Sequence, residues 1–181
     1  MKKVCVLLAE GFEEIEALTT VDLLRRAEVY VDTVSIEDEY LVRGAHGITV
    51  QTEDLFGEVD FSAFDMIVLP GGMPGTTNLG LHLGVKKLLV DFVKDNRLIA
   101  AICAAPTVLG KYGLLKGRKA TCYPGLEKEL LGAVVSRDSV CVDGNIITSK
   151  GVGTAIEFSL KLISILINEK KAKEISDAIV F

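Results

Sequence analysis

The sequence predicts an α/β fold with a mostly parallel, doubly wound sheet, and two patterns along the chain predict it. The first is a set of short, near-continuous apolar runs, typical of strands covered on both faces, at residues 4–9, 29–36, 66–69 and 98–102. The second is the helical spacing of apolar residues over 15–27 and 85–93. Alternation of strand and helix is typical of right-handed βαβ units, so we expect helices on both faces of the sheet.

Further segments complete the expected fold. An antiparallel insertion is expected at residues 40–50, and a second hairpin at 139–149, where Asp143-Gly144 suits a tight primed turn. Both should lie towards a sheet edge or the surface. Apolar spacing then predicts a helix over 154–168 and a final short helix over 170–179.

Length and composition fit one soluble domain over residues 1–181. Apolar residues make up 49% of the chain, enough to bury a sizeable core. The densest apolar stretch, 156–167, is interrupted by Glu157 and Lys161 and falls short of the roughly 18 apolar residues that a membrane helix needs. The net charge is −5 and the basic residues are scattered, which argues against nucleic acid and favours small-molecule or protein partners.

Cysteine usage indicates a reducing compartment. The four cysteines are widely spaced without a C-x-x-C pair, and no export signal precedes them, so we expect free thiols in the cytoplasm. His46 and His82 have no ligand-type spacing with the cysteines and are expected at the surface or flanking a helix, so no metal is predicted. The chain also lacks a P-loop and a dinucleotide fingerprint, which disfavours a nucleotide cofactor.

Three loops should meet at one crevice, because the carboxyl ends of parallel strands share an edge of the sheet. These loops are residues 10–16, 70–75 and 103–106. In the second loop, Gly71 and Gly72 could expose backbone amides as an oxyanion hole, or they could simply form a turn.

Cys103 is the candidate nucleophile in the third loop. Small neighbours permit a tight strand-to-helix turn, and a helix opening near Pro106 would direct its positive end at the sulfur and favour a thiolate. The alternative is a buried small hydrophobic residue, a common state of free cysteines. The other cysteines are interpreted as structural: Cys5 in the first strand, Cys122 in a short strand before Tyr123, and Cys141 in the second hairpin.

An acidic partner for Cys103 is expected among Glu13, Glu14 and Glu16, at the start of the first helix. Carboxylates there are stabilised by the helix macrodipole whether or not they have another role. Helical geometry places Glu13 and Glu16 on neighbouring faces and turns Glu14 away, so one of the three can lean towards Cys103. Beside a thiolate its pKa should be raised, which suits proton transfer near neutral pH.

Taken together, four stretches resemble the ThiJ/PfpI superfamily, and within it the branch of the Parkinsonism-associated protein deglycase. The stretches are AEGFEEIE at 9–16, LPGG at 69–72, AAICAAP at 100–106 and TSKGVGT at 148–154. The resemblance covers essentially the whole chain and implies a homodimer with a flavodoxin-like, glutamine-amidotransferase-like three-layer sandwich. It also implies that Cys103 is a nucleophile or oxidation sensor and that Glu16 is its protonated partner. Gly71 and Gly72 would line the pocket.

Two positions depart from the pattern of that superfamily. Some members place a histidine near the cysteine where this chain has Tyr123, so a histidine-assisted proton relay is not predicted, although Tyr123 could donate a hydrogen bond. The protease-like branch has histidine directly after the cysteine, whereas Ala104 follows here, which argues against a peptidase. Together with the two glycines, Ala104 and Tyr123 are predicted to bind substrate or oxyanion.

Two functions fit these residues. The first is a cofactor-independent glyoxalase or deglycase. In this hypothesis the Cys103 thiolate adds to a 2-oxoaldehyde such as methylglyoxal, Glu16 shuttles a proton, and hydrolysis releases a 2-hydroxy acid without glutathione or metal. The resemblance extends this chemistry to early glycation adducts of amines and thiols. The second function is an oxidative-stress sensor or redox-regulated chaperone without turnover, in which Cys103 is oxidised to the sulfinic state. No residue supports a thiamin-pathway enzyme.

Overall fold

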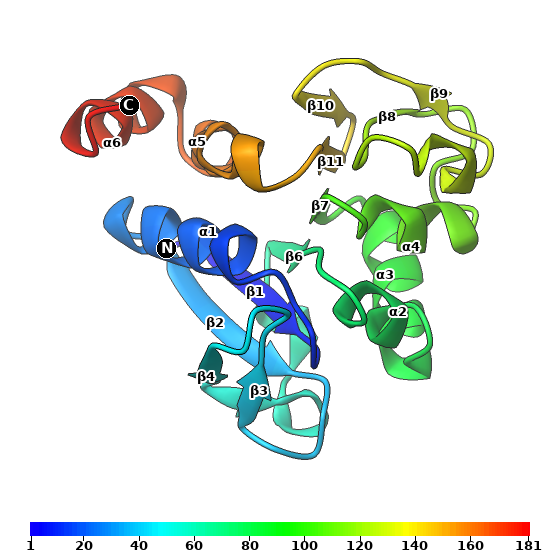
Figure 1. Cartoon of the computed structure of the whole chain (residues 1–181). Coiled ribbons are helices and arrows are strands. Elements are labelled where there is room, and N and C mark those ends of the chain that lie inside the picture. The colour runs from blue at the N-terminus through cyan, green and yellow to red at the C-terminus, as the bar shows by residue number, and fades with distance from the viewer.

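The computed structural model describes residues 1–181 and contains a seven-stranded, mostly parallel central sheet with helices on both faces (Figure 1). The strand order is β10-β11-β7-β6-β1-β2-β5, and every neighbouring pair is parallel except β10 and β11. The strands are β1 Lys3–Leu8, β2 Tyr30–Ser35, β5 Asp54–Leu55, β6 Met66–Leu69, β7 Leu98–Ile102, β10 Val140–Asp143 and β11 Ile146–Ser149. The flavodoxin-like α/β class predicted from the sequence is confirmed.

Two layers of helices cover the sheet. They are α1 Glu14–Arg26, α2 Gly75–Leu79, α3 Leu83–Lys94, α4 Pro106–Lys111, α5 Ala155–Leu166 and α6 Glu169–Ala178. α5 packs against both α1 and α6 on one face, while α2, α3 and α4 lie on the other (Figure 1). Each face of the sheet has its own hydrophobic core, and alternate residues of β1 point into one or the other. Val4 and Val6 belong to the core under α1 and α5, whereas Cys5 and Leu7 belong to the core under α3.

Both predicted hairpins form antiparallel pairs, and the second belongs to the central sheet. β3 (Leu41–Arg43) pairs with β4 (Thr49–Gln51) in a separate two-stranded sheet. β10 forms one edge of the central sheet, whereas β11 pairs in parallel with β7 and aligns Ser149 with Ile102. The loop that follows β11 therefore begins beside Cys103.

Short elements complete the chain and correct one expectation. β8 (Lys119–Ala120) and β9 (Val134–Val135) form a small parallel sheet. Single 3₁₀ turns span Phe56–Glu58, Phe61–Ala63, Glu127–Glu129 and Val152–Thr154. The prediction that Cys122 lies in a strand is wrong, because β8 is only two residues long and ends at Ala120. Cys122 is buried in the loop that follows.

Several helices begin with recognisable capping chemistry. Nδ1 of His82 accepts a hydrogen bond of 3.1 Å from the Val85 amide at the start of α3, so His82 flanks a helix as predicted. Asn168 Oδ1 accepts one of 2.8 Å from the Lys171 amide at the start of α6. Pro106 opens α4, where its missing amide hydrogen costs nothing. None of the helices combines the length and the apolar character needed to cross a membrane.

Candidate active site

Cys103 occupies a strained turn between β7 and α4. Its φ is +64°, a left-handed conformation that costs a residue with a Cβ atom roughly 1–2 kcal/mol. The turn is held on both sides, because the Cys103 amide donates to the Ser149 carbonyl oxygen at 3.0 Å and its carbonyl accepts from the Tyr123 amide at 2.8 Å. Strain of this kind concentrates at functional sites, so the backbone itself marks Cys103 as a candidate for chemistry.

Glu16 is the carboxyl group beside this cysteine, and it is fully buried. Its Oε2 accepts a hydrogen bond of 2.8 Å from the Gly71 amide, while its Oε1 has no hydrogen-bond partner. The absence of a side chain at Gly71 allows Cys103 and Glu16 to lie close together, since a Cβ atom there would lie 2.5 Å from Cβ of Cys103 and 2.7 Å from Oε2 of Glu16. The loop after β6 thus brings the two side chains together.

The protonation states of Glu16 and Cys103 depend on each other. Burial raises the pKa of Glu16 to about 7, although the hydrogen bonds with Gly71 and Cys103 oppose the rise. Burial and the neighbouring Glu16 raise the pKa of the Cys103 thiol, while the amides of Ala104 and Gly72 lower it in part. Repulsion from Glu16 vanishes when Glu16 takes up a proton, so a thiolate forms most readily beside a protonated Glu16.

This result modifies the expectation that a helix dipole alone would favour the thiolate. α4 has only six residues, and it begins three residues beyond Cys103. Burial and Glu16 raise the pKa of the thiol above its ordinary value, so the thiolate that the helix was expected to favour is disfavoured in the folded protein. Glu16 is the ionisable side chain that lies close enough to exchange a proton with the sulfur.

An open cleft of about 620 Å³ gives access to both groups. Cys103, Glu16, Gly72 and Tyr123 line it, together with Glu13, Ile15, His46, Pro124 and the loop 150–154. Gly151 faces both groups, since a Cβ atom there would make ordinary contacts of 3.4 Å with the Tyr123 ring and 3.8 Å with Oε1 of Glu16. Half of the Tyr123 side chain is exposed, so a small molecule can reach the sulfur past it.

The remaining predicted residues contribute through their backbone. Gly71 lies behind the cleft, and its amide is already bonded to Glu16. The Ala104 amide interacts with the sulfur, but its side chain lines a different cavity of about 470 Å³ beside α2 and α4. The substrate- and oxyanion-binding roles of Gly71, Gly72, Ala104 and Tyr123 stay predictions.

His46 is the cleft residue that sequence reasoning missed. It was expected at the surface, and its side chain is 68% exposed, yet it lines the same cleft as Cys103. Its Nδ1 lies 2.9 Å from Oε2 of Glu14 and 3.5 Å from Oε2 of Glu13. These three side chains form the one group of three or more His, Cys, Asp or Glu residues whose potential ligand atoms all lie within 4.8 Å of one another. The glycines at 44 and 47 signal a tight turn around His46, but no sequence signal places that turn beside α1.

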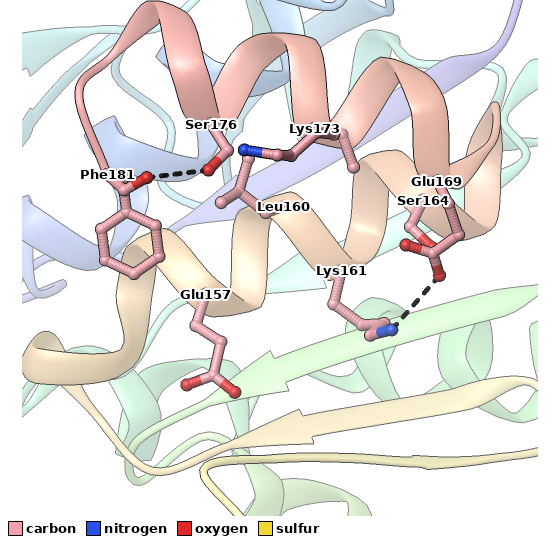
Figure 2. A pocket seen from close by; sticks show the side chains of 9 residues that line it. Glu157, Leu160, Lys161, Ser164, Glu169, Lys173, Ser176 and Phe181 are labelled. Atoms are coloured by element: carbon pink, nitrogen blue, oxygen red, sulfur yellow. Dashed lines mark hydrogen bonds and ion pairs between the residues drawn. The ribbon is translucent and has the colours of Figure 1, made fainter.

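A second groove, between α5 and α6, lacks comparable chemistry. Figure 2 shows its side chains, which include an ion pair of 3.6 Å between Lys161 and Glu169 and a hydrogen bond from Ser176 to the Phe181 carbonyl oxygen. The groove measures about 260 Å³ and contains no cysteine or histidine. The Cys103 cleft is therefore the candidate active site.

Known relatives match nearly the whole chain. The DJ-1/PfpI family matches over residues 2–165. Protein dj-1beta of Drosophila melanogaster is 37% identical over 97% of this chain and 95% of its own. Glutathione-independent glyoxalase DJR-1.2 of Caenorhabditis elegans is 35% identical over 92% of this chain and 89% of its own. Protein DJ-1 homolog B of Arabidopsis thaliana is 40% identical over 99% of this chain, which spans only 41% of that longer relative.

Solved structures match the fold as well. Oxidized DJ-1 of Toxoplasma gondii superposes with a TM-score of 0.96 at 39% identity, covering 100% of this chain and 99% of that one. DJ-1beta of Drosophila melanogaster superposes with a TM-score of 0.94 at 36% identity, covering 99% of this chain and 97% of that one. The likeness extends over every element that lines the Cys103 cleft.

Proposed function

This chain belongs to the DJ-1/PfpI family, and we propose that it is a cofactor-independent glyoxalase and protein deglycase. Its substrates are 2-oxoaldehydes of the methylglyoxal type and their early glycation adducts. The observation that carries the proposal is a sulfur nucleophile, Cys103, in contact with a carboxyl group, Glu16, whose pKa is about 7, in an open cleft. A relative from Caenorhabditis elegans bears the name glutathione-independent glyoxalase, which supports the same activity.

The first step is addition of the Cys103 sulfur to the aldehyde carbon. Glu16 takes the thiol proton as the carbon–sulfur bond forms, and the aldehyde oxygen then receives that proton to give a hemithioacetal. The amides of Gly72 and Ala104, which lower the pKa of the thiol, stabilise negative charge on the sulfur before the attack.

The second step moves hydrogen from the first substrate carbon to the second. Glu16, ionised again, removes the proton from the first carbon and returns it to the second, while a proton passes likewise from the first oxygen to the second. This oxidises the first carbon and reduces the second, so no external oxidant is needed. The product is a thioester of a 2-hydroxy acid on Cys103, and water cleaves it to restore the thiol.

Early glycation adducts enter by the same route. An aldehyde that adds to an amine of another molecule gives a carbinolamine, and one that adds to a thiol gives a hemithioacetal. When that bond breaks, the amine or thiol leaves and the carbonyl group re-forms for capture by Cys103. Deglycation then ends in the same 2-hydroxy acid as glyoxalase turnover.

Methylglyoxal consumption without any added thiol tests this proposal. Wild type, Cys103→Ser and Glu16→Gln are compared, with Cys122→Ala as the matched control because Cys122 is a buried thiol outside the cleft. We expect loss of turnover by at least about 100-fold in the first two variants and near-wild-type turnover in the control. Absence of turnover in the wild type, or full turnover of Cys103→Ser, would contradict the proposal.

Differences in exposure among the cysteines support a second candidate function, that of an oxidative-stress sensor or redox-regulated chaperone. Cys103 is partly exposed, whereas Cys5, Cys122 and Cys141 are buried. Two equivalents of peroxide would convert the Cys103 thiolate to a sulfinate, with water as the reduced product, and a protonated Glu16 would donate a hydrogen bond to it. Mass spectrometry after mild peroxide treatment should find Cys103 modified first. Preferential oxidation of any other cysteine would exclude this role.

A homodimer is also part of the proposal. Ile15 and Leu18 expose apolar side chains along α1, and Ile48 exposes another on the neighbouring hairpin. Apolar surface of this kind is typical of a protein interface. Light scattering coupled to gel filtration should give twice the chain mass, and Leu18→Glu should shift the protein towards the monomer. A wild-type monomer at micromolar concentration would contradict the dimer.

A further inference from the structure

His46 presents a free imidazole nitrogen beside the Cys103 cleft. It lies in the turn between β3 and β4, and its Nδ1 is 2.9 Å from Oε2 of Glu14. Its Nε2 makes no hydrogen bond within the protein. The ring lines the same open cleft as Cys103 and Glu16.

Glu14 is placed to keep a negative charge beside that ring. It is only 3% exposed, and its Oε1 accepts hydrogen bonds from the amides of His46 at 2.8 Å and Ile48 at 3.3 Å. Burial alone would raise the pKa of Glu14, but hydrogen bonds from the His46 ring and from these amides lower it below its usual value. Glu14 therefore stays ionised and holds the proton of the ring on Nδ1.

The hairpin that carries His46 is fixed against the active-site loop. The Gly11 amide donates to the Arg43 carbonyl oxygen and the Ala45 amide donates to the Phe12 carbonyl oxygen, each at 2.8 Å. At Gly44 a Cβ atom would lie 2.3 Å from Cδ of Glu14, so only glycine permits the approach of the two elements. The imidazole is thus oriented by the fold, although it is exposed.

Carboxylates dominate the charge around His46. Besides Glu14, Oε2 of Glu13 lies 3.5 Å from Nδ1. The other ionisable groups nearby are Arg43 on the same hairpin, and Lys150, Tyr123, Glu16 and Cys103 in the cleft. The hydrogen bond with Glu14 and the charges of Glu13 and Glu14 raise the pKa of His46 above its usual value. A protonated ring is therefore available near neutral pH.

We propose that His46 and Glu14 form a carboxylate–imidazole dyad in which His46 is the acid–base residue for the substrate oxygens and Glu14 positions it. This inference rests on the proposed glyoxalase activity. As Glu16 removes the proton from the first carbon, the His46 imidazolium donates its Nε2 proton to the second oxygen. When Glu16 returns its proton to the second carbon, the neutral ring takes the proton of the first oxygen, which becomes the thioester carbonyl. Both residues regain their starting states.

A divalent metal is the competing occupant of the same side chains. Glu13, Glu14 and His46 could ligate one, since their potential ligand atoms cluster within 4.8 Å. The geometry favours the dyad, because Nδ1 of the ring is already at hydrogen-bond distance from Glu14 while Oε1 of Glu14 is occupied by two amides. Metal binding is therefore one outcome of the experiment.

The experiment compares His46→Gln and Glu14→Gln with His82→Asn, the control at the α3 N-terminus, which keeps a capping side chain. We expect kcat to fall about 10- to 100-fold in the first two variants and to stay unchanged in the control. In the wild type, kcat/KM should rise as Glu16 ionises near pH 7 and fall at higher pH as His46 loses its proton. In His46→Gln, the fall of kcat/KM at high pH should disappear. Iodoacetamide should still alkylate Cys103 of this variant at the wild-type rate.

Two outcomes overturn the dyad: an unchanged pH profile in His46→Gln, or loss of wild-type activity in EDTA that Zn²⁺ restores. A readout independent of turnover separates this inference from the proposed function. Titration of the His46 ring by NMR should give a raised pKa in the wild type and a value near 6.5 in Glu14→Gln. If the wild type has no glyoxalase activity, that titration still decides whether the dyad exists, and equal values in the two proteins would refute it.

Discussion

The Gly71 amide donates a hydrogen bond of 2.8 Å to Oε2 of Glu16 and so ties the loop after β6 to the buried side of α1. The contact leaves no room for a side chain at Gly71, because a Cβ atom would sit 2.5 Å from Cβ of Cys103. One glycine therefore lets a carboxyl group and a thiol from distant parts of the chain lie side by side.

Gly71→Ala should separate Cys103 from Glu16. Relief of the 2.5 Å and 2.7 Å contacts requires backbone movement, which costs about 1–3 kcal/mol of unfolding free energy. We expect turnover to fall by at least about 100-fold, measured by methylglyoxal consumption, and the urea midpoint to fall with it. Gly57→Ala is the control, because a Cβ atom there meets nothing within 4 Å. Full activity of Gly71→Ala would show that the glycine is not needed.

Glu16→Gln should stabilise the protein at alkaline pH. Burial raises the pKa of Glu16 from 4.5 to about 7, so its contribution to stability is full below pH 4.5 and is lost as the pH rises through 7. At about 1.4 kcal/mol per pKa unit, the cost of ionised Glu16 at pH 8 is about 3 kcal/mol. The variant stays neutral and escapes this cost, so its advantage in urea unfolding should grow from pH 4.5 to pH 8.

Glu39→Gln serves as the control for that experiment, because Glu39 is exposed. Its stability relative to wild type should stay within about 0.5 kcal/mol at every pH. A stability difference between Glu16→Gln and wild type that does not change with pH would mean that Glu16 has an ordinary pKa in the folded protein.

Local patterns predict most of the fold, and tertiary pairing explains what they miss. The apolar runs at 66–69 and 98–102 coincide with β6 and β7, since strands buried on both faces leave a continuous apolar signal. β5, β8 and β9 have two residues each, too few to show a periodicity. Their strands depend on partners distant in the sequence, so a single chain segment could not reveal them.

The candidate site also contains residues that the sequence predicts and one that it does not. Cys103 could be predicted because it follows a buried strand at the carboxyl edge of a parallel sheet. The same argument narrows its partner only to Glu13, Glu14 and Glu16, and the resemblance to the ThiJ/PfpI superfamily is what selects Glu16. His46 could not be predicted, because its place in the cleft depends on the docking of a hairpin against Glu14, which lies 32 residues away in the sequence. The pKa values of Cys103 and Glu16 depend on how deeply the folded protein buries them, and a local sequence pattern does not predict that burial.

Gly44→Ala should disturb the His46 hairpin while both residues of the dyad stay unsubstituted. Its Cβ atom would lie 2.3 Å from the Glu14 carboxyl carbon, so the hairpin or Glu14 must move. We expect a loss of about 1–3 kcal/mol in unfolding free energy and a His46 pKa, measured by NMR, closer to its usual value. An unchanged His46 titration would show that the turn tolerates a side chain.

Cys103→Gly should be more stable than Cys103→Ala, the reverse of the usual order. Alanine keeps a Cβ atom at a φ of +64°, whereas glycine adopts this conformation without strain. The gain should be about 1 kcal/mol by urea unfolding. Ala105→Gly is the matched control two residues on, where φ is −60° and glycine should cost about 0.5–1 kcal/mol. If glycine were the less stable residue at both positions, the backbone at Cys103 would hold no strain, and its unusual geometry would lose its value as a mark of function.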